Sequence, residues 1–292
     1  MHPAVKNLHI SRELPGFSGA QIFVASHDGK TWFVRKAAGA PATSLRVRAQ
    51  AEKQRAWALQ RDQVFRTPSI LDDGEVDGLY WFDMELVRGV DAATHLREAS
   101  FPEVRQFAEQ MCAHLRWSSG APPLRQGGSN AFMALQERVL RARQISSSSL
   151  IASSSFDLIL QKLNILQTRG AVPPTLCHGD LTLENMLVDE SGKIYVVDLL
   201  DSPFEHWWLD IAKTHQDLAA GWYLRRQSAI APSVTQYVSA RMLQTAGEID
   251  AGYAQIHVLL IACTLLRVFP YAQNDTDRRF LAERIDHFSS HL

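Results

Sequence analysis

The N-terminal part of the chain alternates between short apolar runs and turn residues. Residues 21–26 and 31–36 are rich in β-branched and aromatic side chains, and the His-Asp-Gly-Lys sequence between them predicts a hairpin turn. Residues 44–60 contain mostly good helix formers. The Asp-Asp-Gly sequence at 72–74 predicts a turn, and residues 79–87 predict a further strand. The pattern therefore predicts a small β-rich unit that contains one helix.

After Gly89 the apolar positions recur mainly at helical spacing. Residues 101–116 and 131–143 carry apolar side chains three and four positions apart, which predicts amphipathic helices. Residues 175–197 contain two short strand-like runs around a turn, and the remainder is again helical. The apolar stretch 258–266 is much shorter than the about 20 residues that a membrane-spanning helix needs. We therefore expect it to be a buried helix in a larger, helical part of the protein.

Composition narrows the class of protein. The chain has 292 residues, 46% of them hydrophobic, which is enough to bury a sizeable core. Lys and Arg number 30 against 31 Asp and Glu, so the basic excess typical of nucleic-acid binders is missing. The N-terminal sequence lacks the layout of a signal peptide. The cysteines are too widely spaced for a disulfide framework or a zinc site, and they favour a reducing cytoplasm: Cys112, Cys177 and Cys263.

One segment carries residues suited to phosphoryl transfer. His178 and Asp180 are followed, after four residues, by Asn185, and Asp198 comes at the end of the apolar run 194–197. Phosphoryl transfer needs a carboxylate that orients the attacking hydroxyl and accepts its proton, and oxygen ligands that hold Mg²⁺ against the β- and γ-phosphates. Asp180 suits the first role, and Asn185 and Asp198 suit the second. Because these roles fit one mechanism, the spacing favours an ATP- and Mg²⁺-dependent phosphotransferase.

The same segment closely resembles the aminoglycoside phosphotransferase and choline kinase family, whose members are relatives of the protein kinases. The resemblance implies an α+β, two-lobed protein-kinase-like fold, with a nucleotide-binding N-lobe at residues 1–88 and a helical C-lobe at residues 89–292. His178 is then expected to support the catalytic loop, and Asp210 to accept backbone N–H bonds from it. The sequence 198–217 also resembles bacterial members linked to surface-polysaccharide synthesis.

The resemblance assigns nucleotide-binding roles in the N-terminal part. They comprise a short phosphate-covering loop, a lysine on the α- and β-phosphates with its glutamate partner, and a hinge that pairs adenine through backbone groups. The corresponding residues are Gly16, Ser18, Gly19, Lys36, Glu52, Glu85 and Val87.

Arg35 and Lys36 compete for the phosphate-binding role. Strand alternation places the two side chains on opposite faces of the sheet. If Lys36 faces the nucleotide, Val34 shares its face and forms a compact ceiling for adenine; if Arg35 does, the ceiling is the bulkier Phe33. We favour Lys36.

Three functions are compatible with these residues. The first is a small-molecule kinase, and the second is a pseudokinase that binds nucleotide and regulates a partner without turnover. Pseudokinases typically lose the base or a metal ligand, whereas Asp180, Asn185 and Asp198 are all present. The third is a protein kinase, which is disfavoured because no Ala-Pro-Glu sequence follows Asp198. The sequence therefore favours a small-molecule kinase.

Charge gives an indication about the acceptor. Aminoglycosides and choline are cations and call for an acidic or aromatic site. Residues 203–292 contain eight Lys and Arg against nine Asp and Glu, so this region is not enriched in acids. We therefore expect a neutral or anionic hydroxyl compound, such as a sugar or glycan precursor, with Arg225, Arg226 and Arg267 as candidates to hold its polar groups.

Overall fold

The structure is a computed structural model, which describes residues 2–14, 19–124, 131–145, 150–168, 172–202, 204–226, 229–272 and 274–292. The chain forms two compact units. The first comprises Met1–Val90 and Met186–Asp201, and the second comprises Asp91–Asn185 and Ser202–Leu292. The segment 186–201 thus belongs to the first unit. A single boundary after residue 88 would place this segment in the second unit instead.

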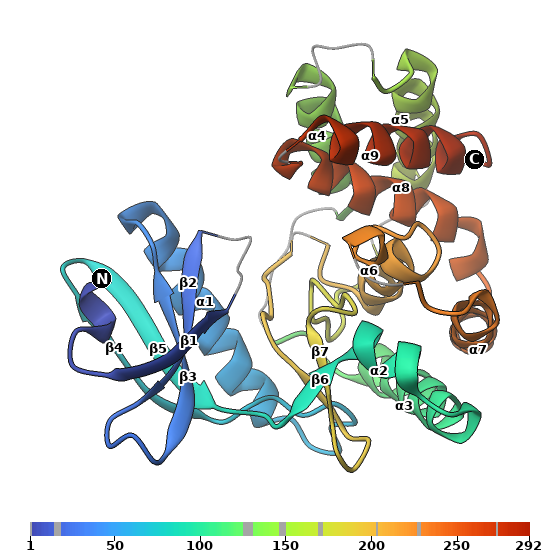
Figure 1. Ribbon diagram of the computed structural model, residues 1–292. Coiled ribbons are helices and arrows are strands. Elements are labelled where there is room, and N and C mark those ends of the chain that lie inside the picture. The colour runs from blue at the N-terminus through green and yellow to red at the C-terminus, as the bar shows by residue number, and fades with distance from the viewer. Residues whose placement is uncertain are drawn as a thin grey trace. The chain divides into compact units, whose positions relative to one another are not determined.

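A five-stranded antiparallel sheet forms the body of the first unit (Figure 1). Its strands follow the order β1-β2-β3-β5-β4, so that β3 is central. The strands are β1 (His9–Leu14), β2 (Ala20–Ser26), β3 (Trp32–Ala38), β4 (Ile70–Val76) and β5 (Leu79–Glu85). Helix α1 (Pro41–Ala58) packs on this sheet, and the short 3-10 helix η1 (Pro3–Val5) precedes it in the chain.

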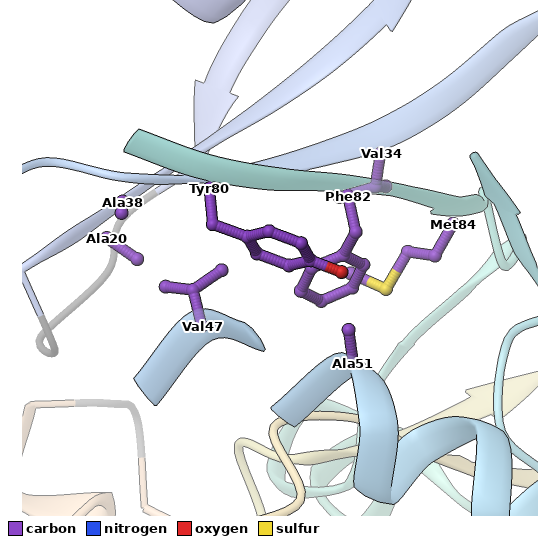
Figure 2. Close-up of a cluster of buried hydrophobic side chains, with 8 residues drawn as sticks. All are labelled: Ala20, Val34, Ala38, Val47, Ala51, Tyr80, Phe82 and Met84. Carbon is purple, nitrogen blue, oxygen red and sulfur yellow. The ribbon is translucent and has the colours of Figure 1, made fainter. Parts of the chain in front are cut away.

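The core of the first unit lies between α1 and one face of the sheet (Figure 2). Residues i and i+4 of a helix share a face, and Val47 and Ala51 of α1 point in this way toward Tyr80 and Phe82 of β5. The complete cluster is Ala20, Val34, Ala38, Val47, Ala51, Tyr80, Phe82 and Met84. Burial of these apolar side chains fixes the register of β3, because a shift by one residue would exchange its two faces.

The turn predicted at 72–74 is wrong, because these residues lie inside β4. The hairpin between β4 and β5 turns instead at Asp77 and Gly78, whose φ angles are 52° and 73°. Two consecutive positive φ values are typical of the tight hairpin turn that an Asp-Gly pair favours. Within β4, the carboxylate of Asp73 accepts a hydrogen bond from Tyr80 Oη of β5 at 2.6 Å.

A second sheet of three short strands has the order β6-β7-β8, with β6 (Gly89–Asp91), β7 (Met186–Asp189) and β8 (Ile194–Val196). Gly89 is required at this pairing, because a Cβ atom there would lie 2.3 Å from the carbonyl oxygen of Val188. Strands β7 and β8 are antiparallel, and the turn between them is closed by Asp189, which accepts N–H bonds from Ser191 and Lys193.

The second unit is mainly helical. Its helices are α2 (Ala92–Glu98), α3 (Phe101–Gly120), α4 (Ala131–Ile145), α5 (Ser153–Thr168), α6 (Trp207–Leu218), α7 (Pro232–Ile249), α8 (His257–Val268) and α9 (Asp275–Ser289), with short 3-10 helices η2 (Leu224–Arg226), η3 (Tyr253–Gln255) and η4 (Phe269–Tyr271). Helix α8 packs against α4, α6 and α9 and is buried along most of its length, as its apolar sequence predicts. Among the described residues, no helix combines the length and apolarity needed to cross a bilayer. The β-rich and helical units confirm the predicted α+β class.

Candidate active site

A buried carboxylate holds the segment that contains Asp180. Asp210, in the first turn of α6, accepts the backbone N–H of His178 at 2.8 Å and that of Gly179 at 3.0 Å. The thiol of Cys177 lies 3.4 Å from the same side chain. Gly179 has a φ of 88°, a conformation that glycine adopts without strain. Asp210 therefore makes the backbone contacts that the family resemblance assigns to it.

The loop is also closed by its own side chains. His178 is buried, and its Nδ1 accepts the backbone N–H of Asp180 at 3.2 Å. The side-chain amide of Asn185 donates through Nδ2 to the carbonyl oxygen of Asp180 at 2.9 Å. Because the nitrogen is used in this way, Oδ1 is the atom of Asn185 that can ligate a cation. His178 thus contacts the backbone of the loop, while Asp180 and Asn185 are brought together.

Two cations contact the carboxylate of Asp180. Lys213 Nζ of α6 lies 3.0 Å from Asp180 Oδ1, and Arg267 Nη1 of α8 lies 3.3 Å from the same atom. Burial acts to raise the pKa of Asp180, but the charges of Lys213 and Arg267 outweigh it and keep this pKa below its usual range. Asp180 is therefore ionised at neutral pH, and 24% of its side chain stays exposed to receive a substrate.

Lys213 belongs to a polar face of α6 that supports the loop. Asp210, Lys213, Thr214 and Asp217 occupy positions i, i+3, i+4 and i+7, which share one face of a helix. Thr214 Oγ1 donates to the carbonyl oxygen of Leu181 at 2.9 Å. Of these four residues, only Asp210 was predicted from the sequence. Helical spacing of polar residues next to apolar ones was the signal that could have found the others.

Asp217 lies at the C-terminal end of this polar face. Its carboxylate accepts the backbone N–H groups of Leu183 at 2.9 Å and Tyr223 at 3.0 Å. Burial raises the pKa of Asp217 to about 7, against the opposing effect of these two hydrogen bonds. Burial also lowers the pKa of Lys213 to about 8, although Asp180 acts to raise it. Helix α6 thus holds both ends of the segment 178–183 by buried polar contacts.

Replacing Lys213 with methionine is expected to raise the pKa of Asp180, because the nearest cation that stabilises its carboxylate is lost. The acidic limb of kcat/KM against pH, which reports on a base in the free enzyme, should then move to higher pH. Lys30→Met, in the exposed hairpin between β2 and β3, is the control and should leave the limb in place. An unmoved limb in a folded Lys213→Met protein contradicts this role for Lys213.

The first unit brings together two further candidate residues. The ammonium of Lys36, on β3, is fully buried and pairs with the carboxylate of Asp198, which follows β8 and is 28% exposed. Asp198 has a φ of 60°, a strained conformation for a residue other than glycine and one that recurs at functional sites. The buried Lys53 of α1 donates to the carbonyl oxygen of Leu200 at 2.6 Å and holds the chain just after Asp198.

The structure separates Lys36 from Arg35 as strand alternation predicts. Arg35 faces the opposite side of the sheet, where both its Nε and Nη2 lie 2.6 Å from the carboxylate of Asp83. Its guanidinium also stacks over the Trp81 ring at 3.8 Å from the ring centre. Arg35 is thus committed to a buried ion pair, which leaves Lys36 as the candidate for the phosphates.

The ammonium of Lys36 pairs with Asp198. Glu52 lies on α1, where its side chain is exposed. The role of Glu52 as a partner of Lys36 stays a prediction.

The remaining predicted nucleotide-binding residues lie at the ends of strands. Gly19 precedes β2 with a φ of 72°, and its carbonyl oxygen accepts the N–H of Gly39 at 3.0 Å. Glu85 is the last residue of β5, and its backbone N–H donates to the carbonyl oxygen of Ser69 at 2.9 Å. Val87 follows in the connection to β6. Gly16 and Ser18 lie outside the described residues. The roles of these residues in binding ATP stay predictions.

Comparison with known proteins identifies the family. The model of the phosphotransferase enzyme family matches residues 11–248, which is most of the chain. The chain belongs to the phosphotransferase enzyme family. The segment that holds Asp180, Asn185, Asp198 and Asp210 lies within the matched region. A search of the curated proteins finds no match to this sequence.

Solved structures of phosphotransferases share the fold. A thermostable mutant of aminoglycoside phosphotransferase APH(4)-Ia, in a ternary complex with AMP-PNP and hygromycin B, has a TM-score of 0.66 at 18% identity, over 98% of this chain and 93% of that one. The choline kinase LicA from Streptococcus pneumoniae has a TM-score of 0.57 at 12% identity, over 99% and 96% of the two chains. At these identities the likeness shows the fold, which is that of the family named in the sequence analysis.

Proposed function

We propose that the protein transfers the γ-phosphoryl group of ATP, with Mg²⁺, to a hydroxyl of a small molecule, and that this molecule is a sugar or glycan precursor. The observation that carries the proposal is the state of Asp180. Its carboxylate is held ionised by Lys213 and Arg267, while its loop is fixed by Asp210. A fixed carboxylate with a low pKa suits the orientation of a hydroxyl and the acceptance of its proton.

Asp180 and Lys213 form one functional pair in this mechanism. The hydroxyl of the acceptor hydrogen-bonds to Asp180, which directs the hydroxyl oxygen at the γ-phosphorus and accepts its proton. The new O–P bond forms as the bond between the γ-phosphorus and the β,γ-bridging oxygen breaks, and ADP leaves. Since the phosphoryl transition state is largely loose, positioning contributes more than strong basicity. A base of low pKa is therefore compatible with the reaction, and Lys213 keeps it ionised.

The oxygen atoms of Asn185 and Asp198 fit Mg²⁺. This ion prefers hard oxygen ligands and is commonly bound by one or two side chains together with phosphate oxygens and water. Asn185 directs its amide nitrogen to a carbonyl group and so keeps Oδ1 for a metal, and Asp198 retains partial exposure. A Mg²⁺ ion ligated by these side chains would neutralise charge on the β- and γ-phosphates.

Lys36 supplies the cation for the nucleotide in this proposal. It is a buried ammonium group next to Asp198, so one strand residue and one metal ligand lie together in the first unit. A buried lysine interacts with phosphate more strongly than an exposed one, because water screens the charge less. The neighbouring proteins of this fold include complexes with AMP-PNP and ADP, which supports nucleotide binding.

A panel of acceptors tests the substrate class. In a coupled ADP-release assay, we expect sugars or sugar acids to be phosphorylated and kanamycin, hygromycin B and choline to be poor acceptors, because the base is contacted by two cations. Reactions without acceptor give the background hydrolysis of ATP. Efficient turnover of an aminoglycoside or choline, with the sugars inactive, would overturn the substrate assignment and leave phosphotransfer standing.

A further inference from the structure

The two cations that contact Asp180 differ in how far the protein itself occupies them. They come from α6 and α8, which pack on each other (Figure 1). Both lie against one oxygen of the base, since Lys213 Nζ is 3.0 Å and Arg267 Nη1 is 3.3 Å from Asp180 Oδ1. The Lys213 side chain is 2% exposed and also donates to Gln216 Oε1 at 3.1 Å. The Arg267 side chain is 28% exposed, and among the described residues its contact with Asp180 is its one hydrogen bond or ion pair. Arg267 is therefore the cation with donors left for a bound molecule.

Arg225 shows the contrasting case of a guanidinium that the protein itself holds. Its Nε lies 2.9 Å from the carboxylate of Asp277, and its Nη1 donates to the carbonyl oxygen of Trp222. The group also stacks over the Trp222 ring, at 3.3 Å from the ring centre. These contacts use Arg225 within the protein, although its sequence made it a candidate to hold the acceptor. The side chain of Arg226 lies outside the described residues. Arg267 is the remaining candidate of the three.

The second oxygen of the base is left for the acceptor. Both cations contact Oδ1, and among the described residues Oδ2 of Asp180 has no hydrogen bond or ion pair. In the proposed reaction the acceptor hydroxyl donates to this oxygen. Because Oδ1 and Oδ2 belong to one carboxylate, the guanidinium of Arg267 lies beside the acceptor atoms that neighbour the reacting hydroxyl. Asp180 and Arg267 belong to the same unit, so this placement is set within the second unit.

We propose that Arg267 is a specificity-determining residue, which donates to an oxygen atom of the acceptor next to the hydroxyl that Asp180 orients. This inference rests on the proposed phosphotransferase function and specifies its acceptor class, a compound with an oxygen substituent beside the reacting hydroxyl, such as a vicinal diol. A guanidinium has N–H donors and no acceptor. A neighbouring oxygen pairs with these donors, whereas a methylene leaves them unpaired and an ammonium group is repelled. Arg267 thus selects against an amino group at that position.

Calorimetry with matched sugars tests this selection. The protein is saturated with Mg²⁺ and AMP-PNP and is titrated with glucose, galactose and their derivatives in which one hydroxyl at a time is replaced by hydrogen or by an amino group, at a pH at which the amines are protonated. At one or more positions we expect the amino sugar to bind about tenfold or more weakly than the parent, with the deoxy sugar between them. This is the lower end for a hydrogen bond from a charged group, because Arg267 is partly exposed. If no replacement weakens binding, or if neither parent sugar binds, the proposal is wrong.

Variants assign the selection to Arg267. In Arg267→Gln the ratio of parent to amino-sugar affinity should fall to within about twofold of one, and the affinity for AMP-PNP should not change. Arg105→Gln, at an exposed position of α3, removes the same charge and should keep the wild-type ratio. A wild-type ratio in folded Arg267→Gln contradicts the proposal. If this variant fails to fold, as judged by its melting temperature, Arg267→Met is measured in the same way, since it keeps the apolar stem of the side chain.

A direct contact is distinguished from a general effect of charge by removing the other cation. Lys213→Met takes a positive charge from the same oxygen of Asp180, but Lys213 is buried, so the ratio of affinities should stay within about threefold of wild type. If Lys213→Met abolishes the ratio as completely as Arg267→Gln does, Arg267 makes no specific contact. If Arg267→Gln instead weakens AMP-PNP binding, Arg267 contacts the nucleotide and the proposal is wrong.

The outcomes separate this inference from the proposed function. If the sugars bind with an Arg267-dependent preference but no acceptor gains a phosphoryl group, the phosphotransferase function fails and the selection by Arg267 remains. If wild type phosphorylates each amino sugar with the kcat/KM of its parent sugar, Arg267 does not select the acceptor and the phosphotransferase function remains.

Discussion

Replacement of Asp180 with alanine is expected to lower kcat by about 10²- to 10⁴-fold, the usual contribution of a positioned general base. The affinity for ATP should change less than about twofold, because Asp180 acts on the acceptor hydroxyl rather than on the nucleotide. The contacts of Asp180 support a role that is separate from nucleotide binding, since both cations that contact its carboxylate come from α6 and α8 of the second unit. Steady-state kinetics with an accepted substrate and calorimetry with ATP measure the two quantities.

Two further variants define the origin of this loss. Asp180→Asn preserves the shape of the side chain but removes its charge, and it should lose nearly as much activity as Asp180→Ala. Asp157→Asn, on an exposed surface of α5, makes the same change away from the site and should keep wild-type kcat. If Asp180→Ala has the wild-type kcat, the proposed role of Asp180 as the base is wrong. Absence of turnover in every variant and in wild type, with intact ATP binding, would favour the pseudokinase hypothesis.

Replacement of Asp198 with alanine is expected to reduce both nucleotide affinity and turnover by about tenfold or more. In the proposed mechanism the metal would lose a ligand, and Lys36 loses its partner. In wild type, removal of Mg²⁺ with EDTA should weaken ATP binding, since the metal neutralises phosphate charge that Lys36 alone does not. In Asp198→Ala the same treatment should have little further effect. Calorimetry with and without EDTA gives these four affinities.

The exposed Asp201 provides the control for this experiment. Asp201 lies three residues beyond Asp198, and Asp201→Asn tests whether its carboxylate contributes to metal-dependent binding of ATP. We expect Asp201→Asn to retain metal-dependent ATP binding. If Asp201→Asn loses as much ATP affinity as Asp198→Ala, Asp201 is also a candidate metal ligand. If wild type binds ATP equally well with and without EDTA, the proposed metal site is wrong.

Local spacing predicted best which residues lie together. His178, Asp180 and Asn185 lie in one loop, and the structure joins them by hydrogen bonds within that loop. The placement of Lys36 and Arg35 on opposite faces followed from the two-residue period of a strand, and the antiparallel register of β3 reproduces it. The short apolar run 258–266 predicted a buried helix, and α8 is buried.

The residues that the sequence missed depend on packing between distant segments. Lys213 reaches Asp180 because α6 packs its polar face against the loop 178–183. The sequence does not show which segments of the chain pack together in this way.

The positions of the charged residues in the fold also could not be predicted from composition. Residues 203–292 contain nearly equal numbers of acids and bases, so composition alone predicts a neutral site. The fold separates these charges in space. Acidic residues such as Asp277 and Asp286 are used in structural contacts with Arg225 and Ser155, whereas Lys213 and Arg267 meet at Asp180. Two cations can therefore meet at one carboxylate in a sequence of balanced charge, and only the tertiary arrangement reveals it.

Phosphoryl transfer itself is tested most directly by following the γ-phosphoryl group. The protein, Mg²⁺ and ATP labelled with ¹⁸O in that group are incubated with a mixture of hydroxyl compounds that includes sugars, sugar acids and sugar phosphates, and the products are identified by mass spectrometry. One or more compounds are expected to gain a labelled phosphoryl group with wild type, and the labelled product should fall to background with Asp180→Ala. Label that appears only in inorganic phosphate, or an equal yield of labelled product from Asp180→Ala, would contradict the proposed phosphotransfer by Asp180.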